Sequence, residues 1–153
     1  MNFVHSFPYT CVSIALWVNK TAEIGIVYNP NLEQFFSARR GKGAYLNNER
    51  IKVSGQTDLS QALVFTEVGT RSDEKKMEII YRNLQKIMKE AHGIRSMGSA
   101  ALNMSYVALG GIEAYYEIGI HAWDMAAGAL IVTEAGGYVC DVNGVYHREK
   151  ANL

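Results

Sequence analysis

The sequence lacks the features that would tie it to a disulfide scaffold, a nucleic acid or a membrane. Only two of its 153 residues are cysteines, Cys11 and Cys140, and each lies in an apolar run. Two cysteines so far apart make neither a disulfide framework nor a metal-ligand set, so we expect reduced, buried thiols in a cytosolic protein. Lys plus Arg and Asp plus Glu number 15 each, and a net charge of zero gives no electrostatic reason to expect nucleic acid or membrane partners.

Targeting and membrane-spanning segments are also missing from the pattern. The first residues carry no basic region, and the apolar run over residues 11–18 is too short to cross a bilayer. We find no repeat, low-complexity tract or linker. The hydrophobic share of 48% and charged share of 20% are typical of one soluble domain with a core. We therefore expect a single cytoplasmic domain.

The first third of the chain predicts an antiparallel meander. Short runs rich in Val, Ile and aromatic residues are separated by polar turns, and Asn47-Asn48 is typical of a tight hairpin. The predicted strands cover residues 9–19, which we expect to be buried, and residues 23–28, 34–38, 44–46 and 51–53.

The rest of the chain alternates between strand and helix patterns. A helix beginning near Ser72 should place Met77, Ile80, Leu84, Ile87 and Ala91 on one face, packed on a sheet. Further helices are predicted over residues 99–109 and 123–135, and strands over 63–67, 113–118 and 138–142. Residues 92–96 are either a short connection or another strand. This order indicates an α/β fold in which the meander is followed by a mixed sheet with helices. Residues 145–153 have no apolar period, so we expect a loose tail there.

Asp124 is the first candidate for chemistry, because it opens an otherwise apolar helix. An aspartate at this place usually caps the helix or interacts with its dipole. The alternative is a carboxylate ligand for Mg²⁺, held in place by the rigid helix. One carboxylate cannot make such a site, because magnesium requires octahedral oxygen coordination from several converging groups.

Glu117 is the second candidate, since it is a charge between apolar strand residues. Strand alternation could turn it to solvent, or it could accept hydrogen bonds from the hydroxyls of a polyol beside a metal. His121 is a possible base, but a structural histidine is commoner, and we assign it no role.

Gly98-Ser99-Ala100 is the third feature. Small residues at a helix start can offer free backbone N–H groups to a ligand, or can simply allow tight helix packing. The loop Arg39-Arg40-Gly41-Lys42-Gly43 does not match a phosphate-binding P-loop and is interpreted as a solvated hairpin tip. No nucleophile constellation surrounds His5 and Ser6, and no catalytic residue is assigned.

These segments together resemble the inositol monophosphatase family. The matching blocks begin at Asn2-Phe3-Val4-His5, Ala38-Arg39-Arg40-Gly41, Gly93-Ile94-Arg95-Ser96 and Tyr115-Tyr116-Glu117, and the last continues through Trp123-Asp124 to Glu134-Ala135-Gly136-Gly137. Their order and spacing are similar to the family's from Asn2 to about Gly144. The resemblance therefore indicates a partial inositol monophosphatase domain over residues 1–144 and a divergent tail over 145–153.

The resemblance implies a layered αβαβα phosphatase fold, truncated here, and Mg²⁺-dependent hydrolysis of inositol monophosphates by a lithium-sensitive, cytoplasmic homodimer. It would make Asp124 a metal ligand. Glu117 would bind inositol hydroxyls, and Gly98, Ser99 and Ala100 would contact the polar edge of the inositol ring.

The sequence departs from the family at the metal site. The family's Asp-Pro-Ile-Asp-Gly-Thr motif precedes the Asn-Phe-Val-His block, and its Glu-Glu motif lies further upstream, whereas Met1 here stands where the threonine would be. Because Asp124 is then one ligand without its companions, we expect this chain alone to be inactive, with one sheet face exposed. Two alternatives remain, a non-catalytic protein that regulates a full-length subunit, and a sister phosphatase of nucleotide or fructose bisphosphates.

Overall fold

The computed structural model describes residues 1–68, 74–141 and 143–144. In these residues the meander forms a five-stranded antiparallel sheet whose strands pair in chain order. Its strands are β1 (Val12–Val18), β2 (Thr21–Asn29), β3 (Gln34–Arg39), β4 (Gly43–Leu46) and β5 (Glu49–Ile51). Two hairpins turn on residues with positive φ, at Asn19-Lys20 and Asn47-Asn48, as tight two-residue loops require.

The second half of the chain builds a separate parallel sheet with the strand order β7-β6-β8. The strands are β6 (Leu63–Thr66), β7 (Gly93–Arg95) and β8 (Ala114–Tyr116), and a short 3₁₀ helix, Leu59–Gln61, precedes β6. The predicted antiparallel meander followed by an α/β part is thus confirmed, but in the described residues the second sheet is parallel in both of its strand pairings rather than mixed.

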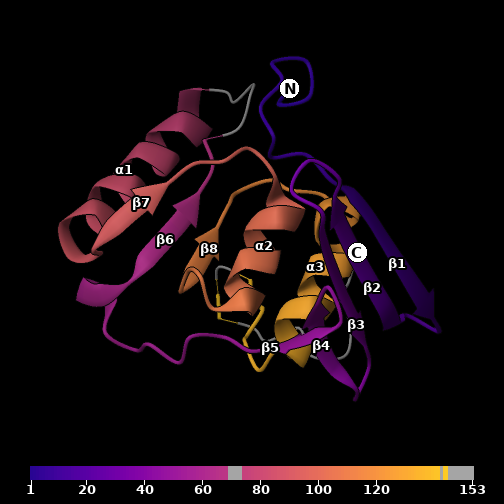
Figure 1. Ribbon diagram of the computed structural model, residues 1–153. Helices are drawn as coiled ribbons and strands as arrows, with labels where there is room; N and C mark the ends of the chain where they lie inside the picture. Colours follow the sequence, from indigo (N-terminus) through magenta and orange to yellow (C-terminus); the bar gives the residue numbers. More distant parts are fainter. Residues whose placement is uncertain (69–73, 142, 145–153) are drawn as a thin grey trace.

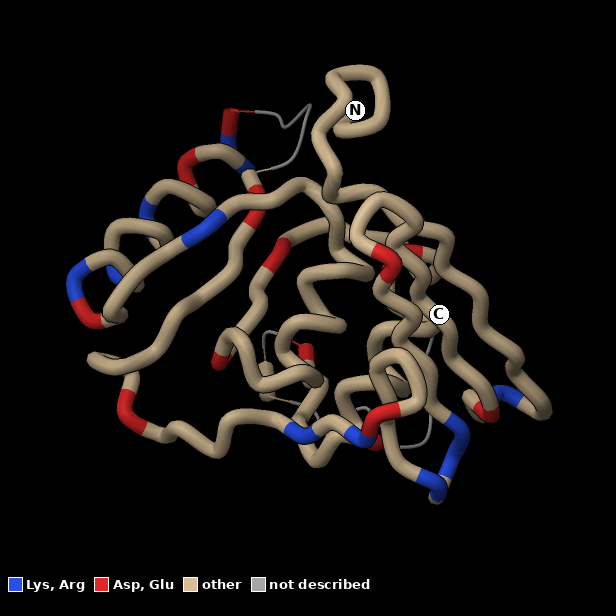
Figure 2. The backbone as a smooth tube through the Cα atoms, viewed as in Figure 1, with Lys and Arg blue, Asp and Glu red and all other residues tan. Residues whose placement is uncertain are grey.

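Of the three α-helices in the described residues, two connect the parallel strands and the third follows β8. They are α1 (Glu74–Glu90), α2 (Ala100–Leu109) and α3 (Ala122–Glu134). The predicted face of α1 is confirmed, because Ile80 is buried and the other four residues of that face are partly buried. Ser72 lies outside the described residues. Acidic and basic residues are interspersed along the solvent side of α1 (Figure 2). None of the described helices combines the length and apolarity needed to cross a membrane.

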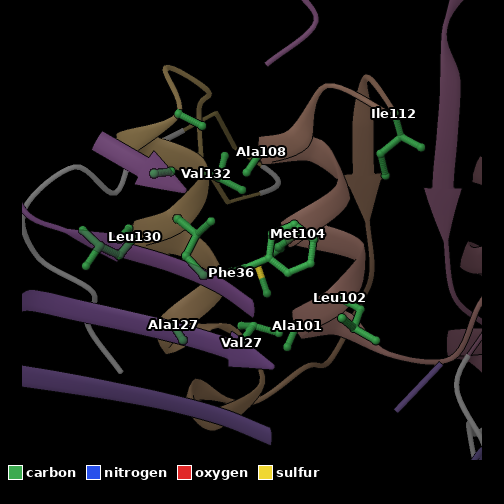
Figure 3. Close-up of a cluster of buried hydrophobic side chains, with 14 of the residues drawn as sticks. Val27, Phe36, Ala101, Leu102, Met104, Ala108, Ile112, Ala127, Leu130 and Val132 are labelled. Carbon is green, nitrogen blue, oxygen red and sulfur yellow. The ribbon is translucent and has the colours of Figure 1, made fainter. Parts of the chain in front are cut away.

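The elements stack in layers, which follow one another as α1, the parallel sheet, the helices α2 and α3, and the five-stranded sheet (Figure 1). The main core lies between the last two layers (Figure 3). Val27 and Phe36 reach it from the sheet, and Leu102 and Ile131 from the helices, all with 0% of their surface exposed. A Cβ at Gly25 would lie 2.7 Å from the Ala127 carbonyl oxygen, so glycine lets α3 approach the sheet backbone.

The opposite side of the five-stranded sheet is apolar and exposed. We call it the outer face, and it consists of Val12, Ile14, Leu16, Val18, Ile24, Tyr28 and Phe35. The strand register places these residues on one side, with Val12 opposite Tyr28 and Tyr28 opposite Phe35. The prediction of a buried first strand is therefore wrong, since β1 is an edge strand whose outward residues are about half exposed. The expected exposed sheet face is present.

Two further predictions need correction near the end of the chain. The strand predicted over residues 138–142 is reduced, among the described residues, to a single bridge at Cys140. Both cysteines are free, but only Cys11 is partly buried and Cys140 is exposed. The run of Tyr138, Val139 and Cys140 suggested burial because it is apolar, yet Tyr138 is 83% exposed. The tail predicted over residues 145–153 lies outside the described residues.

Candidate functional site

Three segments with polar side chains meet where the parallel strands end. Glu67 follows β6, Ser96 follows β7 and Glu117 follows β8. The register aligns these ends, because Phe65 pairs with Arg95 and Thr66 with Tyr116. The carboxyl ends of parallel strands are the usual location of ligand sites in α/β sheets. We call the group of Glu67, Ser96 and Glu117 the carboxyl edge.

Glu67 binds the backbone that links β7 to α2. Its Oε1 atom accepts hydrogen bonds from the amides of Met97 and Gly98, each at 2.8 Å. The same oxygen accepts from Asn103 Nδ2 at 2.9 Å, and Oε2 accepts from Ser96 Oγ at 2.7 Å. An ionised carboxylate is an acceptor only, so four donors satisfy most of its capacity.

The predicted segment Gly98-Ser99-Ala100 lies at the start of α2, as expected. Ser99 is the N-cap, and its Oγ atom accepts a long hydrogen bond of 3.5 Å from the Leu102 amide. The amide of Gly98 is not free for a ligand, because it donates to Glu67. This corrects the expectation of a free N–H group at Gly98, whereas within the described residues the amides of Ser99 and Ala100 have no such carboxylate acceptor.

Glu117 is partly buried rather than turned to solvent. Its Oε2 atom accepts a short hydrogen bond from the Tyr115 hydroxyl. Burial raises the pKa of the Glu117 carboxyl above its ordinary value, and the negative charges of Glu67 and Asp124 add to the rise. The Tyr115 hydrogen bond and Lys76 oppose it. Burial and the hydrogen bond to Glu117 also raise the pKa of Tyr115, so the phenol stays a donor.

Asp124 lies in the first turn of α3, as predicted. Its Oδ2 atom accepts a hydrogen bond of 2.8 Å from the His121 amide, so the capping interpretation is correct for that oxygen. Its other oxygen, Oδ1, takes no hydrogen bond from the described residues. His121 stacks on the Trp123 ring at a centroid distance of 4.6 Å. Asp124 can therefore cap the helix and still offer one oxygen to a cation.

The described residues do not complete a magnesium site. Among them, no group of three or more His, Cys, Asp or Glu side chains could hold a metal ion. Glu67 already accepts four hydrogen bonds, and Glu117 is bonded to Tyr115. Asp124 fits the hard oxygen chemistry of Mg²⁺, but as one ligand of the several required.

A hollow of about 320 Å³ lies beside the start of α3. It is lined by Ser13, Ala15 and Trp17 from β1 and by Ala122, Trp123, Ala126 and Ala127 from α3. The Trp17 indole nitrogen is buried, with no hydrogen-bond partner in the described part of the chain. None of the lining residues belongs to the carboxyl edge, although Trp123 is the neighbour of Asp124 in the first turn of α3.

Sequence reasoning missed Glu67 and Asn103. Glu67 was assigned to the end of a strand, and Asn103 lies inside a helix whose other residues are small or apolar. Asn103 could have been noticed, because a polar side chain in an otherwise apolar helix is buried there only if its amide finds hydrogen-bond partners. Asn103 is 0% exposed and also accepts a hydrogen bond from the Tyr9 hydroxyl at 3.1 Å.

Comparisons with known proteins show which family this chain resembles in sequence and in fold. The family model described as the inositol monophosphatase family matches residues 1–151. Inositol monophosphatase 1 of Mus musculus is 48% identical over 144 residues, which are 94% of this chain and 52% of that protein. The extragenic suppressor protein suhB of Bartonella henselae has a TM-score of 0.89 at 38% identity, over 94% of this chain and 54% of the other. The inositol monophosphate-bound SaIMPase-II has a TM-score of 0.77 at 28% identity, over 88% and 51%.

The chain spans about half the length of the curated relatives it matches. The antiparallel sheet, the parallel sheet and their helices match the part of the solved structures that this chain covers.

Proposed function

We propose, since the chain belongs to the inositol monophosphatase family, that its carboxyl edge binds the polyol of an inositol monophosphate and that Asp124 is one Mg²⁺ ligand of a phosphomonoesterase site. The observation that carries the proposal is the grouping of Glu117, Asp124 and Glu67, whose charges influence one another, at one end of the parallel sheet. Glu67 links this group to the start of α2 through the Gly98 amide. With it we propose the cytoplasmic, lithium-sensitive homodimer that the resemblance implies for an intact enzyme.

Each residue has a separable role in this proposal. Glu117 accepts hydrogen bonds from inositol hydroxyls, and Tyr115 fixes the position of its carboxylate. Ser99 and Ala100 meet the polar edge of the ring at the start of α2, and the turn at Gly98 sets their direction. Asp124 offers Oδ1 to the cation while Oδ2 stays bonded to His121. When bound, Mg²⁺ would activate a water and stabilise charge on the phosphate and the leaving oxygen.

The 153 residues alone should bind the polyol and release no phosphate, because the described residues provide too few oxygen donors for magnesium. We would follow amide resonances by NMR during titration with myo-inositol 1-phosphate, and measure phosphate release with Mg²⁺ in the same samples. The expected result is perturbation of Ser99, Ala100 and Glu117 without turnover.

Each possible result of this experiment has a defined meaning. Turnover that is lost in Asp124→Asn would show that the metal site is complete and the proposed inactivity wrong. The absence of any perturbation at the start of α2 would overturn the proposed substrate. A titration with fructose 1,6-bisphosphate tests the sister-phosphatase alternative, which predicts the stronger response to that ligand.

The exposed outer face favours a second candidate, a non-catalytic chain that binds a full-length family member. Exposed apolar area of this kind is typical of protein-binding surfaces. Sedimentation of the chain mixed with a full-length inositol monophosphatase should then give a complex. Two species that sediment independently at micromolar concentration would exclude this function.

A further inference from the structure

Glu67 accepts more hydrogen bonds than any other carboxylate in the described part of the chain. Its four donors are two backbone amides, one hydroxyl and one side-chain amide, and none of them carries a charge. The two consecutive amides of Met97 and Gly98 converge on a single oxygen, which is the arrangement of a backbone nest around an anion. The carboxylate of Glu67 thus fills the position that an external anion takes in other nests.

We propose that Glu67 is a positioning residue, whose carboxylate holds the turn at Gly98 so that Ser99 and Ala100 face the polyol. The proposal rests on the proposed function for the identity of the ligand. Glu67 does not itself contact the substrate, because its oxygens already face the backbone and Asn103.

The turn at Gly98 is held from two sides. Its φ of +83° favours glycine, and a Cβ there would lie 3.0 Å from Asn2 Oδ1. Asn2 Nδ2 in turn donates to the Met97 carbonyl at 2.8 Å. Asn2 therefore binds the carbonyl side of this turn while Glu67 binds its amide side. Without Glu67 the amides would lose their acceptor and the turn could rotate.

The same carboxylate reaches the interior of α2. Asn103 is completely buried, gives Nδ2 to Glu67 and accepts from Tyr9 with Oδ1. Asn103 is one helical turn after Ser99, and its amide N–H donates to the Ser99 carbonyl at 2.8 Å. Glu67 thus fixes both the turn before the helix and the first turn of the helix itself.

Two variants separate geometry from charge. In Glu67→Gln the amide oxygen can replace Oε1 and the NH₂ group can donate to Ser96 Oγ, so the four hydrogen bonds can persist without the charge. In Glu67→Ala all four donors lose their acceptor. Glu134→Ala is the matched control, because Glu134 accepts from the amides of Gly41 and Gly43, each at 2.8 Å, in the distant β3–β4 turn.

The test is the dissociation constant of myo-inositol 1-phosphate for the full 153-residue chain, measured by amide NMR. Glu67→Ala should weaken binding about tenfold or more and shift the resonances of Gly98, Ser99 and Ala100 in the free protein. Glu67→Gln should stay within about threefold of the unmodified chain, which a role through charge alone would not allow. Glu134→Ala should lower the urea midpoint without changing the dissociation constant.

Three outcomes would contradict the inference. If Glu67→Ala remains folded and binds the ligand as the unmodified chain does, Glu67 does not position the segment. If Glu67→Gln loses binding as fully as Glu67→Ala, the charge rather than the geometry is responsible. If the Glu134→Ala control loses binding equally, the effect is general destabilisation. In contrast, an unmodified chain that binds no inositol 1-phosphate overturns the proposed function, and with it the role of Glu67 toward that ligand.

Discussion

The two sheets depart in opposite ways from the rule that apolar side chains are buried and charged side chains are exposed. The five-stranded sheet exposes an apolar outer face, with Ile14 at 57% and Val12 at 53% exposure. The three-stranded sheet draws the carboxylates of Glu67 and Glu117 out of full contact with water at its carboxyl edge. An exposed apolar face indicates a surface that another polypeptide covers, whereas partly buried charges indicate a polar ligand. The two proposals therefore rest on different sheets, with a protein-binding surface proposed for the first and a polar ligand site proposed for the second.

The largest expected effect comes from two neighbouring phenylalanines that lie on opposite faces of β3. Phe36 is 0% exposed against α2 and α3, and Phe35 is 38% exposed on the outer face. Phe36→Ala should lower the free energy of unfolding by about 3–5 kcal/mol, because it leaves a cavity in the core. Phe35→Ala should cost about 1 kcal/mol or less, through the loss of its contact with Tyr28. Urea unfolding of both variants measures the difference.

Equal losses in the free energy of unfolding of these two variants would contradict the difference between the core face and the outer face. They would mean that Phe35 is as well covered in solution as Phe36, for example by self-association through the outer face. Repeating the Phe35→Ala measurement over a tenfold range of protein concentration separates these cases, because only self-association makes the unfolding midpoint depend on concentration.

A smaller, pH-dependent effect is expected at Glu117. Its pKa is raised in the folded chain, so folding favours the neutral carboxyl. The stability that this provides is present below the ordinary glutamate pKa and is lost as the pH rises through the folded value. Glu117→Gln, which stays neutral and can still accept from Tyr115, should therefore be more stable than the unmodified chain at pH 7. The difference should vanish near pH 4.

Tyr115→Phe sharpens this prediction. The Tyr115 hydrogen bond lowers the pKa of Glu117, so its removal should raise the folded pKa further. The stability loss should then still begin near the ordinary glutamate pKa, but it should continue to higher pH and become larger in total. The measurement is the urea midpoint of the three proteins from pH 4 to pH 8. If the urea midpoints of the unmodified chain and Glu117→Gln change with pH in parallel, Glu117 has the same pKa in the folded and unfolded chain. The raised pKa at the carboxyl edge would then be wrong.

The sequence predicted the helices, strands and turns better than it predicted which of them are buried or paired. Local patterns located the hairpin at Asn47-Asn48 and the buried face of α1, because turn residues and helical spacing act within a few residues. The pattern of β1 predicted burial and was wrong, since apolar alternation does not say whether anything covers the strand. The strand predicted over residues 138–142 shows the same limit, because pairing depends on a partner that the local pattern does not contain.

Local patterns singled out Asp124, Glu117 and Gly98-Ser99-Ala100 as candidates, but not the hydrogen bonds that connect them. Their roles toward metal and substrate, which came from the family resemblance, stay predictions. Glu67 could not be recognised, because its donors Ser96 and Met97 lie about thirty residues away and meet it only when the parallel strands align. Contacts of this kind depend on topology rather than on sequence spacing.

The smallest effect on stability, and the sharpest test of the outer face, is expected from Ile14→Lys. Ile14 lies in the middle of the exposed edge strand β1, so the change should alter the free energy of unfolding by about 0.5 kcal/mol or less. It should nevertheless reduce self-association and weaken any complex with a full-length family member, because it places a charge in the apolar surface that would be buried.

Gln85→Lys on exposed α1 is the matched control for added charge. Sedimentation of all three proteins gives the comparison, and an unchanged complex with Ile14→Lys would show that the partner does not bind at the outer face.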